Sequence, residues 1–344
     1  MELDKDNFYQ SGPSFLTALD WSNSNHRRSI AASLVQGVYA MERDRRQNRH
    51  GGPYAMAPPW WQFFNFNLVE ILFDKHDVSI FGAVFEYTAY SHAVVCYSGS
   101  QSPPPRYVVA VRGTILNAGI REEDSKLNLH CVLNNLDRST RFATALAAAA
   151  RWSAAAGIWL AGHSLGSAIA LLVGRKMIKQ YGIHLETYLF NPPFPSPPIG
   201  RLSNETLKFG FRLAGNLATA ALATALKVEN KEKDHFRVLS RWIPYLFVNP
   251  WDPICSEYLG YFEQREKMGM IGRIAMKHSI GSIVGKTMMG KEDDCEAAHL
   301  IPCGYLSINS GSGYRSFMEA HGIRQWWSPD LELRYQLHRY NSFK

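Results

Sequence analysis

Gly162 and Gly166 flank Ser164 in the sequence GHSLG, which combines a possible nucleophile with two residues that leave room around it. Residues 157–161 form an apolar run typical of a buried strand, and residues 165–182 have the composition of a helix. A sharp turn from strand to helix exposes a serine hydroxyl above the strand ends, close to the N–H groups that begin the helix. We therefore predict that Ser164 is a nucleophile. The alternative is a serine that only caps the helix.

Two further stretches accompany this segment, VVAVRGT at residues 108–114 and LFNPPFPSPPIG at residues 189–200. Together with LAGHSLGSAIALL at residues 160–172, they resemble the class 3, or fungal lipase-like, α/β-hydrolases, in the branch of plant proteins often labelled esterase/lipase. The resemblance covers about residues 80–327. It implies a mostly parallel sheet flanked by helices, with an inserted helical cap or lid. It also implies a serine esterase or lipase that acts on carboxylic esters, with acyl lipids as the expected substrates.

An oxyanion hole is also implied by this resemblance. In the family, a strand ends in Arg-Gly-Thr or Arg-Gly-Ser, and the hydroxyl residue helps to bind the oxyanion. The match assigns this role to Thr114, with the backbone N–H of Leu165 as the second donor. The residues themselves agree, because Gly113 and Thr114 follow a predicted strand, where a loop N–H can face the serine. An ordinary strand end is the alternative.

An acid is expected after the serine, since the chain order on this fold is Ser, then Asp or Glu, then His. Asp252 follows an apolar strand predicted for residues 243–248, and it resembles the family's Asp-Pro-Ile/Val element. The interval from Ser164 to Asp252 is long for the family. The additional residues lie within 201–240, which we expect to form the cap. Within it, residues 213–226 are apolar on two sides, which suits a lid, a substrate-tunnel wall or a buried structural helix.

The base is expected on the loop after the last strand, for which the alternating residues 303–310 are the candidate. His321 lies on that loop and resembles the family's Asp-His-x-x-Tyr-Phe ending, with Ala320 in the place of the acidic residue. His299 precedes the strand and remains the alternative base. His163 should turn away from Ser164 and serve in packing.

Alternating strands and helices are predicted around these residues, which is typical of an α/β sheet. The remaining predicted elements are a helix at residues 29–41, strands at residues 80–88, 92–97, 106–113 and 184–190, and a helix at residues 137–156. The expected organisation is an N-terminal helical segment (1–79) that packs on the core, the hydrolase domain (80–327) and a C-terminal tail (328–344).

Composition narrows the class of protein further. The net charge of +7 comes from dispersed basic residues without a nucleic-acid-binding motif, and we expect the cluster at residues 43–52 to be a solvated turn. The five cysteines form no CxxC pair, so no metal site or disulfide framework is predicted. We expect a cytoplasmic enzyme without a cofactor, with an ester or lipid as its partner and with peripheral contact to a membrane or lipid droplet left open. A catalytically silent scaffold and an acyltransferase with the same triad are the alternative functions.

Overall fold

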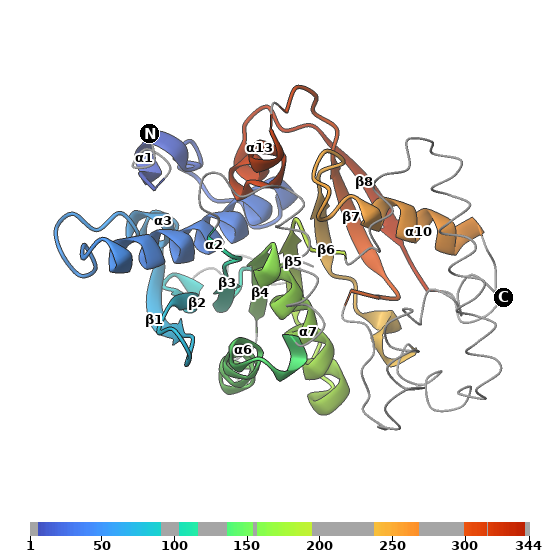
Figure 1. Ribbon diagram of the computed structural model, residues 1–344, viewed down its shortest axis with the longest axis horizontal. Coiled ribbons are helices and arrows are strands. Elements are labelled where there is room, and N and C mark those ends of the chain that lie inside the picture. The colour runs from blue at the N-terminus through green and yellow to red at the C-terminus, as the bar shows by residue number, and fades with distance from the viewer. Residues whose placement is uncertain are drawn as a thin grey trace.

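The described strands form one eight-stranded sheet whose spatial order is the order of the sequence, β1 to β8 (Figure 1). The computed structural model describes residues 6–90, 103–115, 136–153, 157–194, 237–267, 299–314 and 316–340. Strands β3 to β7 are parallel to one another, whereas β1, β2 and β8 run antiparallel to their neighbours. The strands are β1 (Phe66–Phe73), β2 (Ile80–Tyr87), β3 (Tyr107–Val111), β4 (Ile158–His163), β5 (Glu186–Phe190), β6 (Tyr245–Val248), β7 (Gly304–Asn309) and β8 (Leu333–His338).

Helices cover both faces of the sheet, with α2 on one side and α6 and α7 on the other (Figure 1). This layering around a mostly parallel sheet confirms the predicted α/β-hydrolase fold. The α-helices are α1 (Phe8–Ser11), α2 (Ser24–Arg46), α3 (Pro59–Gln62), α6 (Thr140–Trp152), α7 (Leu165–Tyr181), α10 (Glu257–Lys267) and α13 (Phe317–His321). Short 3-10 helices are η2 (Leu136–Arg138), η3 (Leu239–Arg241) and η4 (Ile323–Trp327). No described helix combines the length and apolar character needed to cross a membrane.

Side chains on the central strands alternate between two hydrophobic clusters, one on each face of the sheet. On β4, Trp159 and Ala161 pack in the cluster beneath α2, whereas Leu160 packs in the cluster beneath α7. This period of two places the side chain of His163 on the α2 face. The same rule explains why β3 to β6 have nearly continuous apolar sequences, since both of their faces are covered.

Helix α2 is longer than the predicted 29–41. It is buried on almost all sides between residues 27 and 42, because β2, β3 and β4 pack against one side and α3 and η4 against other sides. The basic cluster at residues 43–52 was expected to be a solvated turn, and its first half is instead the last turn of α2. Arg45 and Arg46 bind the buried carboxylate of Glu42 at 2.8 and 2.7 Å. The basic residues therefore compensate a buried charge within the fold.

The two edge strands β1 and β8 differ from the sequence prediction. β1 lies in the segment expected to be helical, and β8 lies in the expected tail, so residues 303–310 are not the last strand. β1 and β8 are only partly buried. The sequence of β8, LRYQLH, is largely polar, whereas that of β1, FNLVEILF, is apolar enough to have been recognised as a strand. The predicted strand 92–97 and the predicted cap up to residue 236, with the two-sided apolar stretch 213–226, lie outside the described residues.

The pairing of β8 with β7 predicts that the C-terminal segment contributes to stability. Six positions are paired, from Gly304 with His338 to Asn309 with Leu333. Because each backbone hydrogen bond contributes about 1 kcal/mol, a chain ending at Asp330 should melt about 10 °C lower or be insoluble. The matched control is Arg334→Ala, which removes an exposed side chain and keeps the strand. Equal melting temperatures for the shortened and the full chain, measured by circular dichroism, would contradict the role of β8.

Candidate active site

Ser164 occupies the tight turn between β4 and α7 with a backbone conformation that is rare for a residue with a side chain, φ 54° and ψ −125°. Such conformations cost about 1–3 kcal/mol and persist where the surrounding structure enforces them. Here the Ser164 N–H donates to the carbonyl of Phe190 at 2.9 Å, and the Ser164 carbonyl accepts from the Ser167 N–H at 2.9 Å. Leu165 begins α7, so its N–H belongs to the first turn, where helices leave donors without intrahelical partners.

Glycine is required at three positions around this turn because backbone segments approach each other closely. A Cβ on Gly162 would overlap the backbone of Gly166, and a Cβ on Gly166 would overlap the carbonyl of Val111. A Cβ on Gly113 would lie 2.8 Å from the Cβ of Ser164. The end of β3 is therefore held directly beside the serine, as the sequence predicted for this strand end.

The backbone that leads into Thr114 is held at two points, the N–H and the carbonyl of Gly113. The Gly113 N–H donates to the hydroxyl of Tyr39 at 2.8 Å, and the Gly113 carbonyl accepts from the guanidinium of Arg112 at 2.7 Å. Because the C=O and N–H of a trans peptide point in opposite directions, the bond from Arg112 also sets the direction of the Thr114 N–H. Thr114 itself is exposed, next to this fixed peptide.

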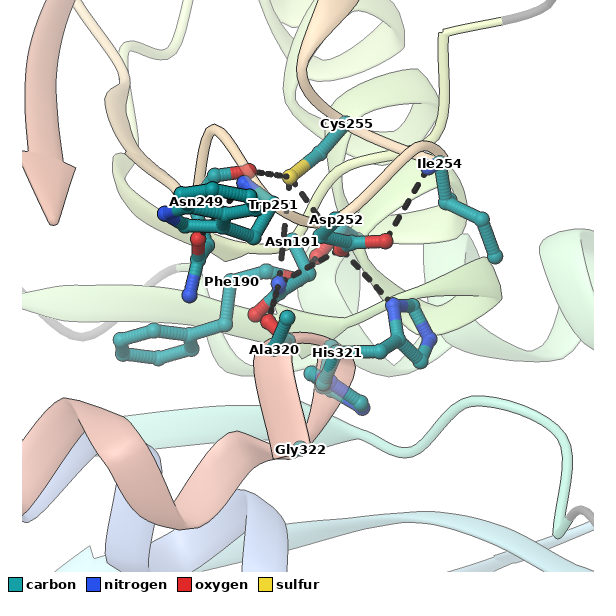
Figure 2. Close-up of polar contacts among 12 residues, drawn as sticks. Phe190, Asn191, Asn249, Trp251, Asp252, Ile254, Cys255, Ala320, His321 and Gly322 are labelled. Carbon is teal, nitrogen blue, oxygen red and sulfur yellow. Dashed lines mark hydrogen bonds and ion pairs between the residues drawn. The ribbon is translucent and has the colours of Figure 1, made fainter. Parts of the chain in front are cut away.

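Asp252 follows β6, is fully buried, and lies at the centre of a dense set of hydrogen bonds (Figure 2). Its Oδ2 accepts from the ring Nδ1 of His321 at 2.9 Å, from the Asn191 amide at 2.7 Å and from the Cys255 thiol at 3.2 Å. Its Oδ1 accepts from the backbone N–H of Ile254 at 3.0 Å. The carboxylate thus receives hydrogen bonds from four groups on three separate segments of the chain.

The surroundings of Asp252 keep it charged. Burial alone would raise its pKa, but the attraction of His321 and the hydrogen bonds of His321, Asn191 and Ile254 outweigh burial, so the pKa lies below its usual value. Burial and the neighbouring carboxylate raise the pKa of Cys255 well above its usual value, which keeps its thiol protonated and able to donate.

His321 ends α13, and its buried ring directs Nδ1 toward Asp252. A carboxylate can only accept, so we assign the ring proton to Nδ1, which leaves Nε2 as the acceptor. The ring of Phe317 stacks on the His321 ring with centroids 5.2 Å apart. This arrangement is typical of a general base whose tautomer is fixed by an acid.

Side chains also bind three consecutive carbonyls, those of Ala320, His321 and Gly322. The Ala320 carbonyl accepts from Asn191 at 3.1 Å and from Gln325 at 2.6 Å, and the Gly322 carbonyl accepts from Gln325 at 2.9 Å. The His321 carbonyl lies 2.7 Å from Nε2 of His163. The backbone that carries His321 is therefore held from several directions.

The structure brings together Ser164, Gly113 and Leu165 at one turn, and Asp252 with His321 beside β5 and β6. Within the described residues, the Ser164 hydroxyl makes no hydrogen bond to His321; such bonds are often long in a free enzyme and shorten when substrate binds. No group of three His, Cys, Asp or Glu residues suited to a metal occurs in the described parts of the chain.

His299, the alternative base, lies elsewhere. Its ring packs against Phe194 with centroids 4.6 Å apart, and its carbonyl accepts from the hydroxyl of Tyr258 at 3.1 Å. The histidine that contacts Asp252 is His321.

Sequence reasoning missed Asn191, Cys255 and Tyr39. Asn191 has a detectable signal, because it is the first polar residue after the apolar end of β5, where functional side chains of parallel sheets gather. Its φ of 46° is also a conformation that asparagine tolerates better than most residues. Cys255 and Tyr39 carry no such signal, since their partners are fixed only by the tertiary fold.

Comparison with known proteins found a full-length relative. A protein of Arabidopsis thaliana named GDSL esterase/lipase is 40% identical over 358 residues, which cover 99% of this chain and 99% of that protein. The crystal structure of a lipase from Rhizopus microsporus var. chinensis is similar over 67% of this chain and 69% of its own, with 12% identity and a TM-score of 0.31. No protein-family model matches the chain. The assignment of the fold rests on the sheet and helices of the chain itself.

We expect Asn191 to stabilise the protein through its side-chain hydrogen bonds, in addition to its tolerance of a positive φ. Asn191→Ala removes the hydrogen bonds to Asp252 and Ala320 and leaves the indole N–H of Trp326 without its 2.6 Å acceptor. We expect the free energy of unfolding in urea to fall by about 3 kcal/mol. Asn48→Ala is the control, because Asn48 is exposed and has a similar φ of 54°. In this variant the free energy of unfolding should fall only by the backbone cost of alanine at a positive φ, about 1 kcal/mol. Equal losses in the two variants would show that the hydrogen bonds of Asn191 contribute nothing.

Proposed function

Because this chain belongs to the same esterase/lipase family as the Arabidopsis protein, we propose that it hydrolyses carboxylic esters with Ser164 as the nucleophile, His321 as the base and Asp252 as the acid. The observation that carries this proposal is the 2.9 Å contact between His321 Nδ1 and the buried, charged Asp252, on the same sheet edge as the turn that presents Ser164. Within the family, the GHSLG turn and the Arg-Gly-Thr strand end favour the class 3, fungal lipase-like, branch.

The first half of the reaction forms an acyl-enzyme. The Ser164 oxygen attacks the ester carbonyl carbon while its proton passes to Nε2 of His321. Asp252 keeps the proton of His321 on Nδ1 and stabilises the imidazolium that forms. The tetrahedral intermediate then expels the alcohol, which takes the proton from Nε2.

The negative charge of the intermediate falls on the former carbonyl oxygen. Leu165 supplies a backbone N–H from the first turn of α7, and Thr114 supplies the second donor from the end of β3. The fixed peptide between Gly113 and Thr114 supports this role, since donors that are already oriented need no reorganisation during the reaction. The positive end of the α7 dipole acts in the same direction.

Water completes the cycle. His321 takes a proton from a water molecule that attacks the acyl carbonyl, and the same proton then returns to the Ser164 oxygen as the carboxylic acid leaves. No cofactor takes part in this scheme. An alcohol in the place of water would give acyl transfer by the same residues, so product analysis with water and an alcohol in competition separates the two activities.

We propose acyl lipids as the substrates, with contact at the surface of a membrane or lipid droplet. Two large apolar side chains in the segments of the acid and the base support this part of the proposal. Trp251, beside Asp252, is 63% exposed, and Met318, in the helix of His321, is 52% exposed. Turnover of p-nitrophenyl esters of graded chain length tests this proposal, and a preference for acetyl over long-chain esters would contradict it.

Ser164→Ala should abolish ester hydrolysis and leave the fold intact, because a single hydroxyl contributes little to stability while the nucleophile is indispensable. We expect kcat to fall by a factor of about 10³ or more, and labelling by a fluorophosphonate probe to disappear. The measurements are the turnover of a short p-nitrophenyl ester and the mass of the protein after treatment with the probe.

The control for this variant is Ser33→Ala, which removes a buried hydroxyl that donates to the carbonyl of Trp60 at 3.0 Å, on α2 and away from the turn. Ser33→Ala should keep turnover and labelling. A wild-type protein that neither turns over esters nor reacts with the probe would instead support the catalytically silent scaffold.

His321→Ala is expected to lower kcat by about three powers of ten, since only oxyanion stabilisation and substrate binding remain without the base. His299→Ala should cost far less, because the ring of His299 packs on Phe194, whereas the ring hydrogen-bonded to Asp252 is that of His321. Both variants are assayed on one short ester after their melting temperatures are compared with wild type. An inactive His299→Ala together with an active His321→Ala would overturn the assignment of the base.

A further inference from the structure

Tyr39 and His163 lie in an unbroken chain of hydrogen bonds that the proposed reaction does not use. The Tyr39 hydroxyl is 2.8 Å from the Gly113 nitrogen and 2.8 Å from Nδ1 of His163. Nε2 of His163 is 2.7 Å from the carbonyl oxygen of His321. The chain of hydrogen bonds thus runs from the N–H of Gly113, the residue before Thr114, to the backbone of His321.

The direction of each bond follows from the chemistry of its partners. A carbonyl only accepts, so Nε2 of His163 carries a proton and donates to His321. Burial lowers the pKa of His163 to about 3, so the ring is neutral and its Nδ1 has to accept. The Tyr39 hydroxyl therefore donates to Nδ1 and accepts from Gly113. Burial raises the pKa of Tyr39 to about 12, so that its hydroxyl keeps the proton that it donates.

We propose that Tyr39 and His163 are positioning residues, which together form a relay that holds the oxyanion-binding strand end and the base in fixed relation to each other. This role rests on the proposed ester hydrolysis. Among the described residues, neither side chain hydrogen-bonds to the Ser164 hydroxyl or to the His321 ring, and the His163 ring packs beside the His321 ring with centroids 5.0 Å apart. They act through the Gly113 peptide at one end and through the His321 carbonyl at the other.

The relay adds side-chain hydrogen bonds between segments that are distant in the sequence. Thr114 follows β3, Ser164 follows β4 and His321 ends α13, so the three groups come from different parts of the chain. Helix α2 is packed against β3, β4 and η4, and Tyr39 projects from it between them. A displacement of about 1 Å in a catalytic group can cost about 10²-fold in rate, so a rigid connection of this kind has a measurable effect.

Removal of the Tyr39 hydroxyl breaks the relay at its centre. In Tyr39→Phe, the Gly113 N–H and Nδ1 of His163 both lose their partner, while the ring that fills the core remains. We expect kcat on a short p-nitrophenyl ester to fall at least tenfold with KM within twofold of wild type, because the loss concerns the transition state and leaves substrate binding unchanged. The rate of labelling by a fluorophosphonate should fall in parallel.

The matched control is Tyr87→Phe. Tyr39 and Tyr87 are each 6% exposed and pack in the same hydrophobic cluster, and the Tyr87 hydroxyl accepts from the indole of Trp21 at 3.4 Å, away from the turn. Tyr87→Phe should retain wild-type kcat at a similar change in melting temperature. Substitution of His163 gives a second measurement: His163→Gln keeps an amide N–H that can reach the His321 carbonyl and should retain more of kcat than His163→Leu, which keeps none.

The outcomes separate the relay from the reaction on which it rests. An active wild-type enzyme whose Tyr39→Phe variant has wild-type kcat, or loses no more than Tyr87→Phe, overturns the relay and leaves ester hydrolysis standing. Equal activity of His163→Gln and His163→Leu overturns the connection to the base. A wild-type protein that is inactive and unreactive toward the probe overturns both proposals.

Discussion

A fully buried carboxylate, Asp252, is the constraint around which this end of the molecule is built. Removal of a carboxylate from water costs several kcal/mol unless donors replace the lost hydration. Here the replacement comes from the end of β5 through Asn191, from the turn after β6 through Cys255 and the Ile254 N–H, and from α13 through His321. A charge that needs all of these donors holds the segments that supply them in one arrangement, and that arrangement also orients the imidazole.

Two residues near this carboxylate have backbone conformations that cost free energy. Asn191 has a left-handed backbone and still satisfies Asp252, Ala320 and Trp326 with one amide group. Ser164 likewise has an unfavourable conformation, and its backbone is held by hydrogen bonds to the Phe190 carbonyl and from the Ser167 N–H. In both cases the surrounding sheet compensates a local strain at a position where a polar group faces the site. Rigidity at the site is therefore a consequence of satisfied polar groups as much as of apolar packing.

A structural feature can be predicted from the sequence when residues close together in the chain determine it. The turn at Ser164 and the strands β3 to β7 are predictable, because glycine spacing and apolar runs are local signals. The edge strand β8 is not, since its sequence LRYQLH buries little and looks like a polar tail. The partners of Asp252 and His163 are also beyond local patterns. Asn191 is 61 residues from Asp252, and Tyr39 is 124 residues from His163, so only the completed sheet brings these pairs together.

The contacts between the two ends of the chain have a consequence for synthesis on the ribosome. Arg28 on α2 donates to the carbonyl of Trp326 at 2.7 Å, and Trp327 packs on Trp60 and donates to the carbonyl of Ser11. The sheet follows sequence order, so its strands can be added one after another as the chain emerges. The surface of α2 and α3 that packs on η4, however, stays uncovered until residues 323–327 have been translated. Nascent chains of this protein therefore keep this surface exposed until η4 has emerged from the ribosome.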